Sequence, residues 1–133
     1  MIFKKQKFSP QEIENFFKSA KEDFSIAGKN KEPKVIFEFS YDTLIKCALA
    51  VCAANGLRIT AKTGHHIELI RKLSEFLNNK DVNAIGNEMR MKRNQNLYDA
   101  IFMVSEKETK DYLKWIEQIL GQVEDYISEA GLR

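Results

Sequence analysis

The residues best suited to chemistry lie in one basic and polar stretch, residues 90–99, in the second half of the chain. It contains Arg90, Lys92 and Arg93, followed by amide side chains, Tyr98 and an aspartate. At about 100° per residue, Arg93 falls at the centre of an apolar helical stripe. The apolar residues within about 40° of it are Val82, Met89, Leu97, Ala100 and Val104. A permanent positive charge is therefore expected where a helix should be buried.

A buried guanidinium cannot lose its proton, so it needs an anion, backbone carbonyls or a hydrated cleft beside it. One interpretation is a structural arginine that pairs with a carboxylate of another helix. The other is a binding or catalytic site, which the neighbouring Arg90 and Lys92 and the polar groups behind them favour. Both interpretations stay open at this point.

Size and composition predict one soluble domain, residues 1–133. The chain has 44% hydrophobic and 30% charged residues, which is ordinary for a globular protein. A net charge of +2 gives no global attraction to nucleic acid or membrane, so any polyanion site must be local. The basic start, residues 1–8, is compatible with a flexible arm or with a packed segment.

The two cysteines predict a reducing compartment. Cys47 and Cys52 lie about 140° apart around one predicted helix, so they cannot easily bridge and instead resemble small buried hydrophobic residues. No spaced His/Cys pairs indicate a metal site, and no cofactor is expected. Without an apolar run of membrane-spanning length or a signal-peptide core, we expect a cytoplasmic protein with no membrane partner.

Apolar periodicity and capping signals predict an all-α protein, an antiparallel bundle of about five helices. Capping boxes begin at Ser9 and Ser105, and Asp81 can cap the fourth helix. Residues 41–54 are apolar on nearly every side, which is typical of a central helix surrounded by others. Residues 57–63 are expected to form a loop. The third predicted helix should bury Ile67, Ile70, Leu73 and Leu77 on one face.

The only two histidines, His65 and His66, begin the third predicted helix. If the third and fourth helices form a hairpin with its turn near residue 80, these histidines lie level with Arg93. His66 should face the core and His65 the edge. Either His66 is a hydrogen-bonded core residue and His65 a surface residue, or one of them is an acid or base for a phosphate held by Arg93.

These features together resemble the HEPN domain family. The resemblance rests on Arg93 and Asn94 followed by Tyr98, with Arg90 one turn earlier. The order of the other features agrees with it over about residues 35–127. These features are the central helix with Tyr41-Asp42, Asn55-Gly56-Leu57-Arg58, Gly64-His65-His66 and Val104-Ser105-Glu106-Lys107-Glu108.

The resemblance implies a homodimeric helical bundle. Many family members are metal-independent ribonucleases in toxin–antitoxin or other defence systems, and others are partners of a small nucleotidyltransferase. By this resemblance Arg93 is the arginine that engages phosphate, and Asn94 is the polar residue that follows it. The family motif ends in a histidine, whereas this chain has Tyr98 there. A tyrosine with a pKa of about 10 is a poor general base at neutral pH.

Two functional hypotheses follow, and we rank binding above catalysis. In the first, a dimer binds RNA, a nucleotide or a partner protein through a cleft around Arg93. Its binding residues are Arg90, Lys92, Asn94, His65 and Asp99. In the second, the protein is a metal-independent endoribonuclease that uses Arg93 with Tyr98 or with one of the histidines, His65 or His66. A third, structural interpretation places Arg93 in an ion-pair network that fixes the dimer.

Overall fold

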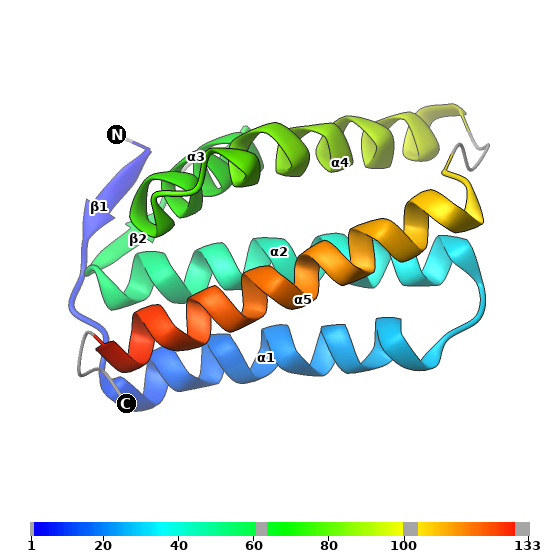
Figure 1. The fold of residues 1–133 in the computed structure, drawn as a ribbon. Helices are drawn as coiled ribbons and strands as arrows, with labels where there is room; N and C mark the ends of the chain where they lie inside the picture. The colour runs from blue at the N-terminus through cyan, green and yellow to red at the C-terminus, as the bar shows by residue number, and fades with distance from the viewer. Residues whose placement is uncertain (1, 61–63, 100–103, 130–133) are drawn as a thin grey trace.

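The computed structural model describes residues 2–60, 64–99 and 104–129, with the backbone alone over residues 96–99. Within these residues five α-helices and two short strands form the regular structure (Figure 1). The helices are α1 (Pro10–Lys29), α2 (Pro33–Ala54), α3 (His65–Leu77), α4 (Lys80–Asp99) and α5 (Glu106–Glu129). The strands are β1 (Phe3–Lys5) and β2 (Leu57–Ile59). The prediction of an all-α bundle of about five helices is confirmed.

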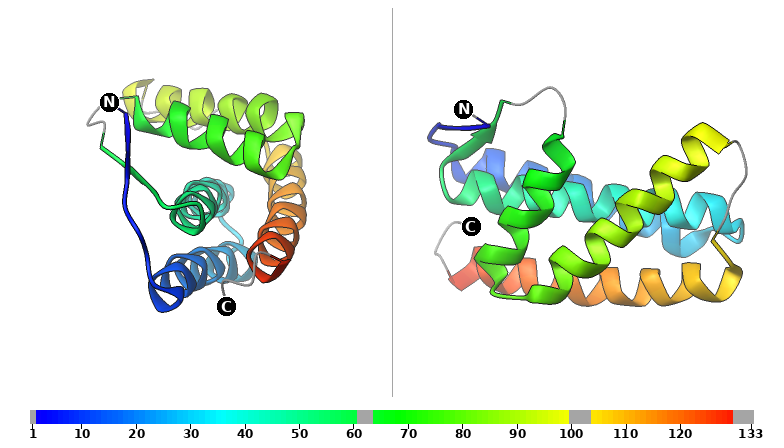
Figure 2. Two further views of the ribbon diagram at one scale, coloured as in Figure 1. Left: turned by 90° about the vertical axis from the view of Figure 1, so that its left-hand side faces the viewer. Right: turned by 90° about the horizontal axis from the view of Figure 1, so that it is seen from above.

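Helix α2 is the centre of the bundle, as its composition predicts. Viewed from one end, α2 is enclosed by α1, α5 and the layer formed by α3 and α4 (Figure 2). Small side chains such as Ala48 and Ala50 are completely buried and allow the surrounding helices to approach closely. Cys47 and Cys52 are free and buried on the same helix. No helix in the described part of the chain is both long and apolar enough to cross a membrane.

Both predicted capping boxes form. The Ser9 hydroxyl accepts from the Glu12 amide at 3.1 Å, and the Glu12 carboxylate accepts from the Ser9 amide at 2.9 Å. Ser105 and Glu108 repeat the arrangement at the start of α5. At α4 the prediction was wrong by two residues. Asn79, not Asp81, is the capping side chain, because its Oδ1 accepts from the Asp81 amide at 3.0 Å.

The two strands differ from the loop predicted for residues 57–63. Strands β1 and β2 pair antiparallel, with Phe3 opposite Ile59. The pairing extends on both sides, because the Gln6 amide donates to the Gly56 carbonyl at 2.9 Å and the Thr60 amide donates to the Ile2 carbonyl at 2.7 Å. Residues 3–6 are therefore packed against the bundle end. Strands of three residues are too short to show the alternation by which sequence reveals a strand.

Ile67 was wrongly predicted to face the core with Ile70, Leu73 and Leu77. It is 41% exposed, whereas Leu69, Ile70 and Leu73 are buried. Around the helix axis the buried arc of α3 runs from Leu69 through Leu73 to Ile70, and Ile67 lies about 110° from the centre of that arc. Ile67 consequently stands at the molecular surface.

Gly86 of α4 lies in close contact with side chains of α2 and α3. A Cβ atom there would lie 2.9 Å from Ile70 Cγ2 and 3.2 Å from Leu44 Cδ2, two fully buried side chains. We expect Gly86→Ala to lower the free energy of unfolding by about 1–2 kcal/mol, because overpacking outweighs the helix propensity gained.

Denaturant unfolding measures this effect, and Gly121→Ala in α5 is the matched control. A Cβ atom at Gly121 meets nothing within 4 Å, so that variant should be about 0.5–1 kcal/mol more stable than the parent. Equal stabilisation by both substitutions would show that α4 is not packed closely on Ile70.

Candidate functional site

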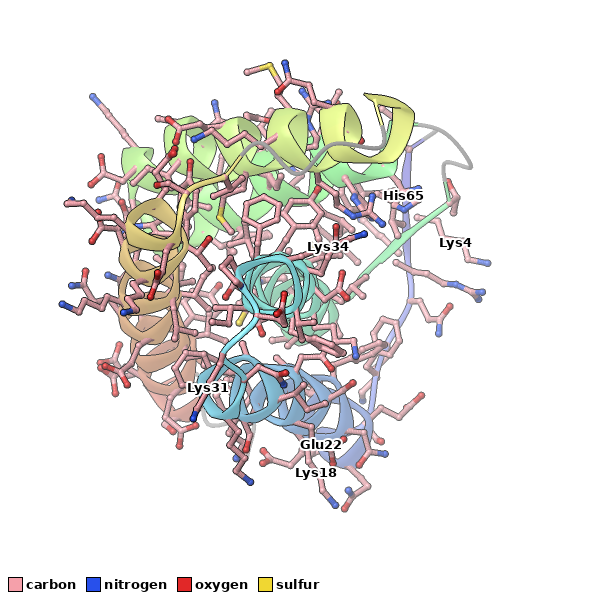
Figure 3. All side chains as sticks on the ribbon, turned by 90° about the vertical axis from the view of Figure 1, so that its right-hand side faces the viewer. Lys4, Lys18, Glu22, Lys31, Lys34 and His65 are labelled. Carbon is pink, nitrogen blue, oxygen red and sulfur yellow. The ribbon has the colours of Figure 1, made fainter. Side chains whose placement is uncertain are left out.

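A pocket of about 230 Å³ lies between the start of α3 and the middle of α4. These two helices meet at their short connection and then diverge, as the right-hand view of Figure 2 shows. We call this the α3–α4 pocket, and its lining residues are Gly64, His65, His66, Ile67, Arg90 and Asn94. In Figure 3 the labelled His65 lies beneath α4, toward the edge where Lys4 of β1 is drawn. The structure thus brings four of the predicted site residues together, namely His65, His66, Arg90 and Asn94.

His66 is held from behind by a residue of the central helix. Its Nδ1 lies 2.9 Å from the hydroxyl oxygen of Tyr41, which is completely buried. The His65 ring packs edge-on against the His66 ring, with centroids 4.5 Å apart. His66 is therefore held by both Tyr41 and His65, and it is one of the residues that line the pocket.

Burial and neighbouring positive groups keep His66 uncharged. Burial first, and then His65, Arg93 and Arg90, lower the pKa of His66 from 6.5 to about 4. Burial also raises the pKa of Tyr41 to about 12, although Arg93 and Arg90 oppose this rise. At neutral pH the pair is therefore a neutral imidazole and a protonated phenol.

Arg93 lies behind the pocket and is not among its lining residues. Its guanidinium carbon stands 5.5 Å from the centre of the Tyr41 ring, a cation–π arrangement. Its Nε lies 3.5 Å from Glu38 Oε2 on α2, close enough for an ion pair. That Nε is buried and makes no hydrogen bond within the described residues, so the pairing with Glu38 lacks hydrogen-bond geometry. The structural interpretation of Arg93, a charge paired with a carboxylate of another helix, describes this contact.

Arg90 supplies the positive charge that lines the pocket. Its Nε donates to Asn87 Oδ1 at 3.2 Å, one turn earlier on α4. Among the described residues no carboxylate forms an ion pair with Arg90, in contrast to Arg71 of α3, which pairs with both Glu68 and Glu75. The charge of Arg90 is consequently available to a bound anion.

Lys92 is directed away from the pocket, although the sequence placed it among the binding residues. Its Nζ donates to Glu108 Oε2 at 2.5 Å and to the Tyr112 hydroxyl at 2.8 Å, both on α5. Burial opposes the charge of Lys92, but these two hydrogen bonds outweigh it and raise its pKa. Lys92 therefore attaches α4 to α5.

Two further site residues of the sequence hypothesis, Tyr98 and Asp99, lie in the last turn of α4, and their side chains lie outside the described residues. Sequence reasoning missed Tyr41 and Glu38 as partners of the site. A signal for Tyr41 was present, because a tyrosine hydroxyl inside the most apolar helix requires a buried hydrogen-bond partner. No comparable pattern marked Glu38.

The chemistry of the pocket suits an anion. It presents a guanidinium, an amide and two imidazoles, and the described residues that line it include no carboxylate. Across the described residues no group of three or more His, Cys, Asp or Glu side chains is placed to hold a metal ion. No protein-family model matches the chain, and neither a curated protein nor a solved structure matches it.

The lowered pKa of His66 predicts a pH dependence of stability. The unfolded chain, with an ordinary histidine pKa of 6.5, binds the proton more tightly than the folded protein, whose His66 has a pKa of about 4. The stability contributed by neutral His66 is thus complete above pH 6.5 and is lost as pH falls from there toward 4.

Denaturant unfolding of the parent and of His66→Gln over this pH range measures the contribution. Relative to His66→Gln, the parent should lose stability progressively as pH falls. Carboxylates that titrate near the lower end of this pH range are present in both proteins. Their effect therefore cancels in the difference between the two free energies of unfolding. A difference that stays constant with pH would contradict a neutral, buried His66.

Proposed function

We propose that this chain is an HEPN-like helical protein that binds the phosphate backbone of RNA through the α3–α4 pocket. The observation that carries the proposal is the convergence of Arg90 and Asn94 of α4 with His65 and His66 of α3 around one pocket. Phosphate oxygens accept hydrogen bonds and carry negative charge, so guanidinium and N–H groups are their usual protein partners. A local site of this kind fits a chain whose net charge is only +2.

The family assignment is part of the same proposal. Its support is the order of motifs along the chain together with the five-helix architecture, in which Arg90, Arg93 and Asn94 all belong to α4. As in that family, we propose a cytoplasmic homodimer in a toxin–antitoxin or defence system, with a small nucleotidyltransferase as a partner. Two exposed apolar side chains, Ile67 in the lining of the pocket and Met91 next to Arg90 in the sequence, favour association with another protein surface.

Substitution of Arg90 tests the binding site. We expect Arg90→Gln to weaken the binding of a fluorescently labelled single-stranded RNA of about 12 nucleotides by about tenfold at low salt, because it removes one charge-assisted phosphate contact. Fluorescence anisotropy measures the affinity. In a plot of the logarithm of the binding constant against the logarithm of the salt concentration, the slope should become less steep by about 0.7.

The matched control is Arg71→Gln. Arg71 is a surface arginine of the neighbouring helix whose charge is already paired with Glu68 and Glu75. The Arg71→Gln substitution removes the same charge from the protein as Arg90→Gln, yet it should leave the RNA affinity within about twofold of that of the parent. Equal weakening by both substitutions would mean that RNA responds to overall charge and that the pocket is not its site.

A second candidate function is a metal-independent endoribonuclease. The observation that favours it is the neutral imidazole of His66 in a pocket that also contains Arg90. A neutral imidazole can accept a proton from a ribose 2′-hydroxyl, and a guanidinium can stabilise the charge that develops on phosphorus oxygens. Arg93, behind the pocket, would add to that positive field.

Incubation with a mixed RNA pool in EDTA separates the two functions. Under the binding proposal the parent shifts RNA in a gel without shortening it. Cleavage by the parent that is lost in both Arg93→Ala and His66→Gln would instead establish the ribonuclease. Cleavage that survives both substitutions would indicate a contaminating enzyme.

A further inference from the structure

The hydroxyl group of Tyr41 is buried within the bundle and has a single hydrogen-bond partner among the described residues, His66 Nδ1 at 2.9 Å. A phenol and a neutral imidazole can share this bond in two ways. Either the Tyr41 O–H donates to an unprotonated Nδ1, or a protonated Nδ1 donates to the Tyr41 oxygen. The two arrangements place the imidazole proton on opposite sides of the ring.

Hydrogen-bond accounting distinguishes the two arrangements. If Nδ1 donated, the Tyr41 O–H would have no acceptor within the described residues and would be left unpaired in the core. An unpaired buried donor costs about 1–3 kcal/mol. If Tyr41 donates, its proton is satisfied and the imidazole proton belongs to Nε2. The second ring nitrogen, Nε2, makes no hydrogen bond within the described residues, and His66 is one of the residues that line the α3–α4 pocket.

We infer that Tyr41 is a positioning residue that holds His66 in its Nε2–H tautomer, so that His66 offers a neutral N–H donor to a phosphate oxygen in the α3–α4 pocket. The identity of the acceptor rests on the proposed function, whereas the tautomer does not. The bound phosphate would then receive a charged donor from Arg90 on one helix and an uncharged donor from His66 on the other.

The packing around Tyr41 limits its movement. The Arg93 guanidinium lies over its ring at 5.5 Å, and Glu38 holds Arg93 from the α2 side at 3.5 Å. Because α2 is the central helix, the Tyr41 hydroxyl has a fixed position relative to α3. A donor held in place before the ligand arrives loses little conformational entropy on binding.

This tautomer also bears on the choice between binding and cleavage. With its proton on Nε2, His66 has no lone pair on the pocket side of the ring. It cannot remove a proton from a 2′-hydroxyl until the imidazole proton moves to Nδ1, and that arrangement leaves Tyr41 unpaired. The geometry therefore favours recognition of phosphate over general-base catalysis.

The first test reads the tautomer directly in the parent protein. Long-range proton–nitrogen correlation spectra of nitrogen-15-labelled protein at neutral pH distinguish the two ring nitrogens. Only two histidines must be assigned, and His65→Gln identifies which signals belong to His66. We expect a protonated Nε2 and an unprotonated Nδ1. The opposite pattern would overturn the inference, whatever the variants do.

The second test removes only the hydroxyl. Tyr41→Phe keeps the ring beneath Arg93, and it should convert His66 to a mixture of tautomers and weaken binding of the labelled single-stranded RNA about three- to tenfold. Tyr126→Phe is the control, because it deletes a hydroxyl that bonds to Asn55 at the other end of α2. It should change neither the His66 spectrum nor RNA affinity.

The outcomes separate the inference from the proposed function. If Tyr41→Phe leaves the His66 tautomer and the RNA affinity unchanged, Tyr41 is not a positioning residue. If the tautomer responds as expected but the parent binds no RNA, the proposed function fails while the role of Tyr41 stands. Thermal unfolding of both variants shows whether a loss of affinity reflects a loss of folded protein.

Discussion

Burial of α2 is the constraint on which the rest of the structure depends. Its middle is apolar on nearly every side, so packing against a single neighbour cannot bury it. The other helices must therefore surround it, and each of them contributes one apolar stripe. Small residues such as Ala48 bring those neighbours close enough for dense packing. Burial of apolar surface around α2 thus determines the architecture before any polar interaction is considered.

A line of polar groups crosses this apolar centre and defines the site. Glu38 and Tyr41 come from α2, Arg93 from α4 and His66 from α3. Each group has a partner in the line, which offsets the cost of removing it from water. Lys92 contributes from outside, since its hydrogen bonds to Glu108 and Tyr112 attach α4 to α5. Arg90 and Arg93, on the same helix, are thereby held in place opposite His66.

The sequence predicted those features that depend on local patterns. Helix starts at Ser9 and Ser105 follow from capping chemistry within four residues, and the central position of α2 follows from composition alone. Counting residues from the α3–α4 turn placed His65 and His66 level with Arg93, and in the structure they line a pocket with Arg90 and Asn94 of the same helix. Features that depend on contacts distant in sequence were missed or misplaced. Apolar spacing assigned Ile67 to the core. The exact rotation of α3 about its own axis is determined by its packing against α2, which the spacing does not show. Lys92 was assigned to the pocket from its position beside Arg93. Its hydrogen-bond partners lie on α5, and no local sequence pattern links Lys92 to that helix.

The pairing of β1 with β2 has a consequence for the order of folding. The two strands are separated along the chain by all of α1 and α2, so bringing them together closes a long loop. Three residues on each side offer few hydrogen bonds against that entropy. The strands can pair only after α1 and α2 have docked and placed the ends of the loop side by side. Backbone amides of β1 and β2 therefore belong to the last structure to form and the first to open, while those of α2 open only with the whole bundle.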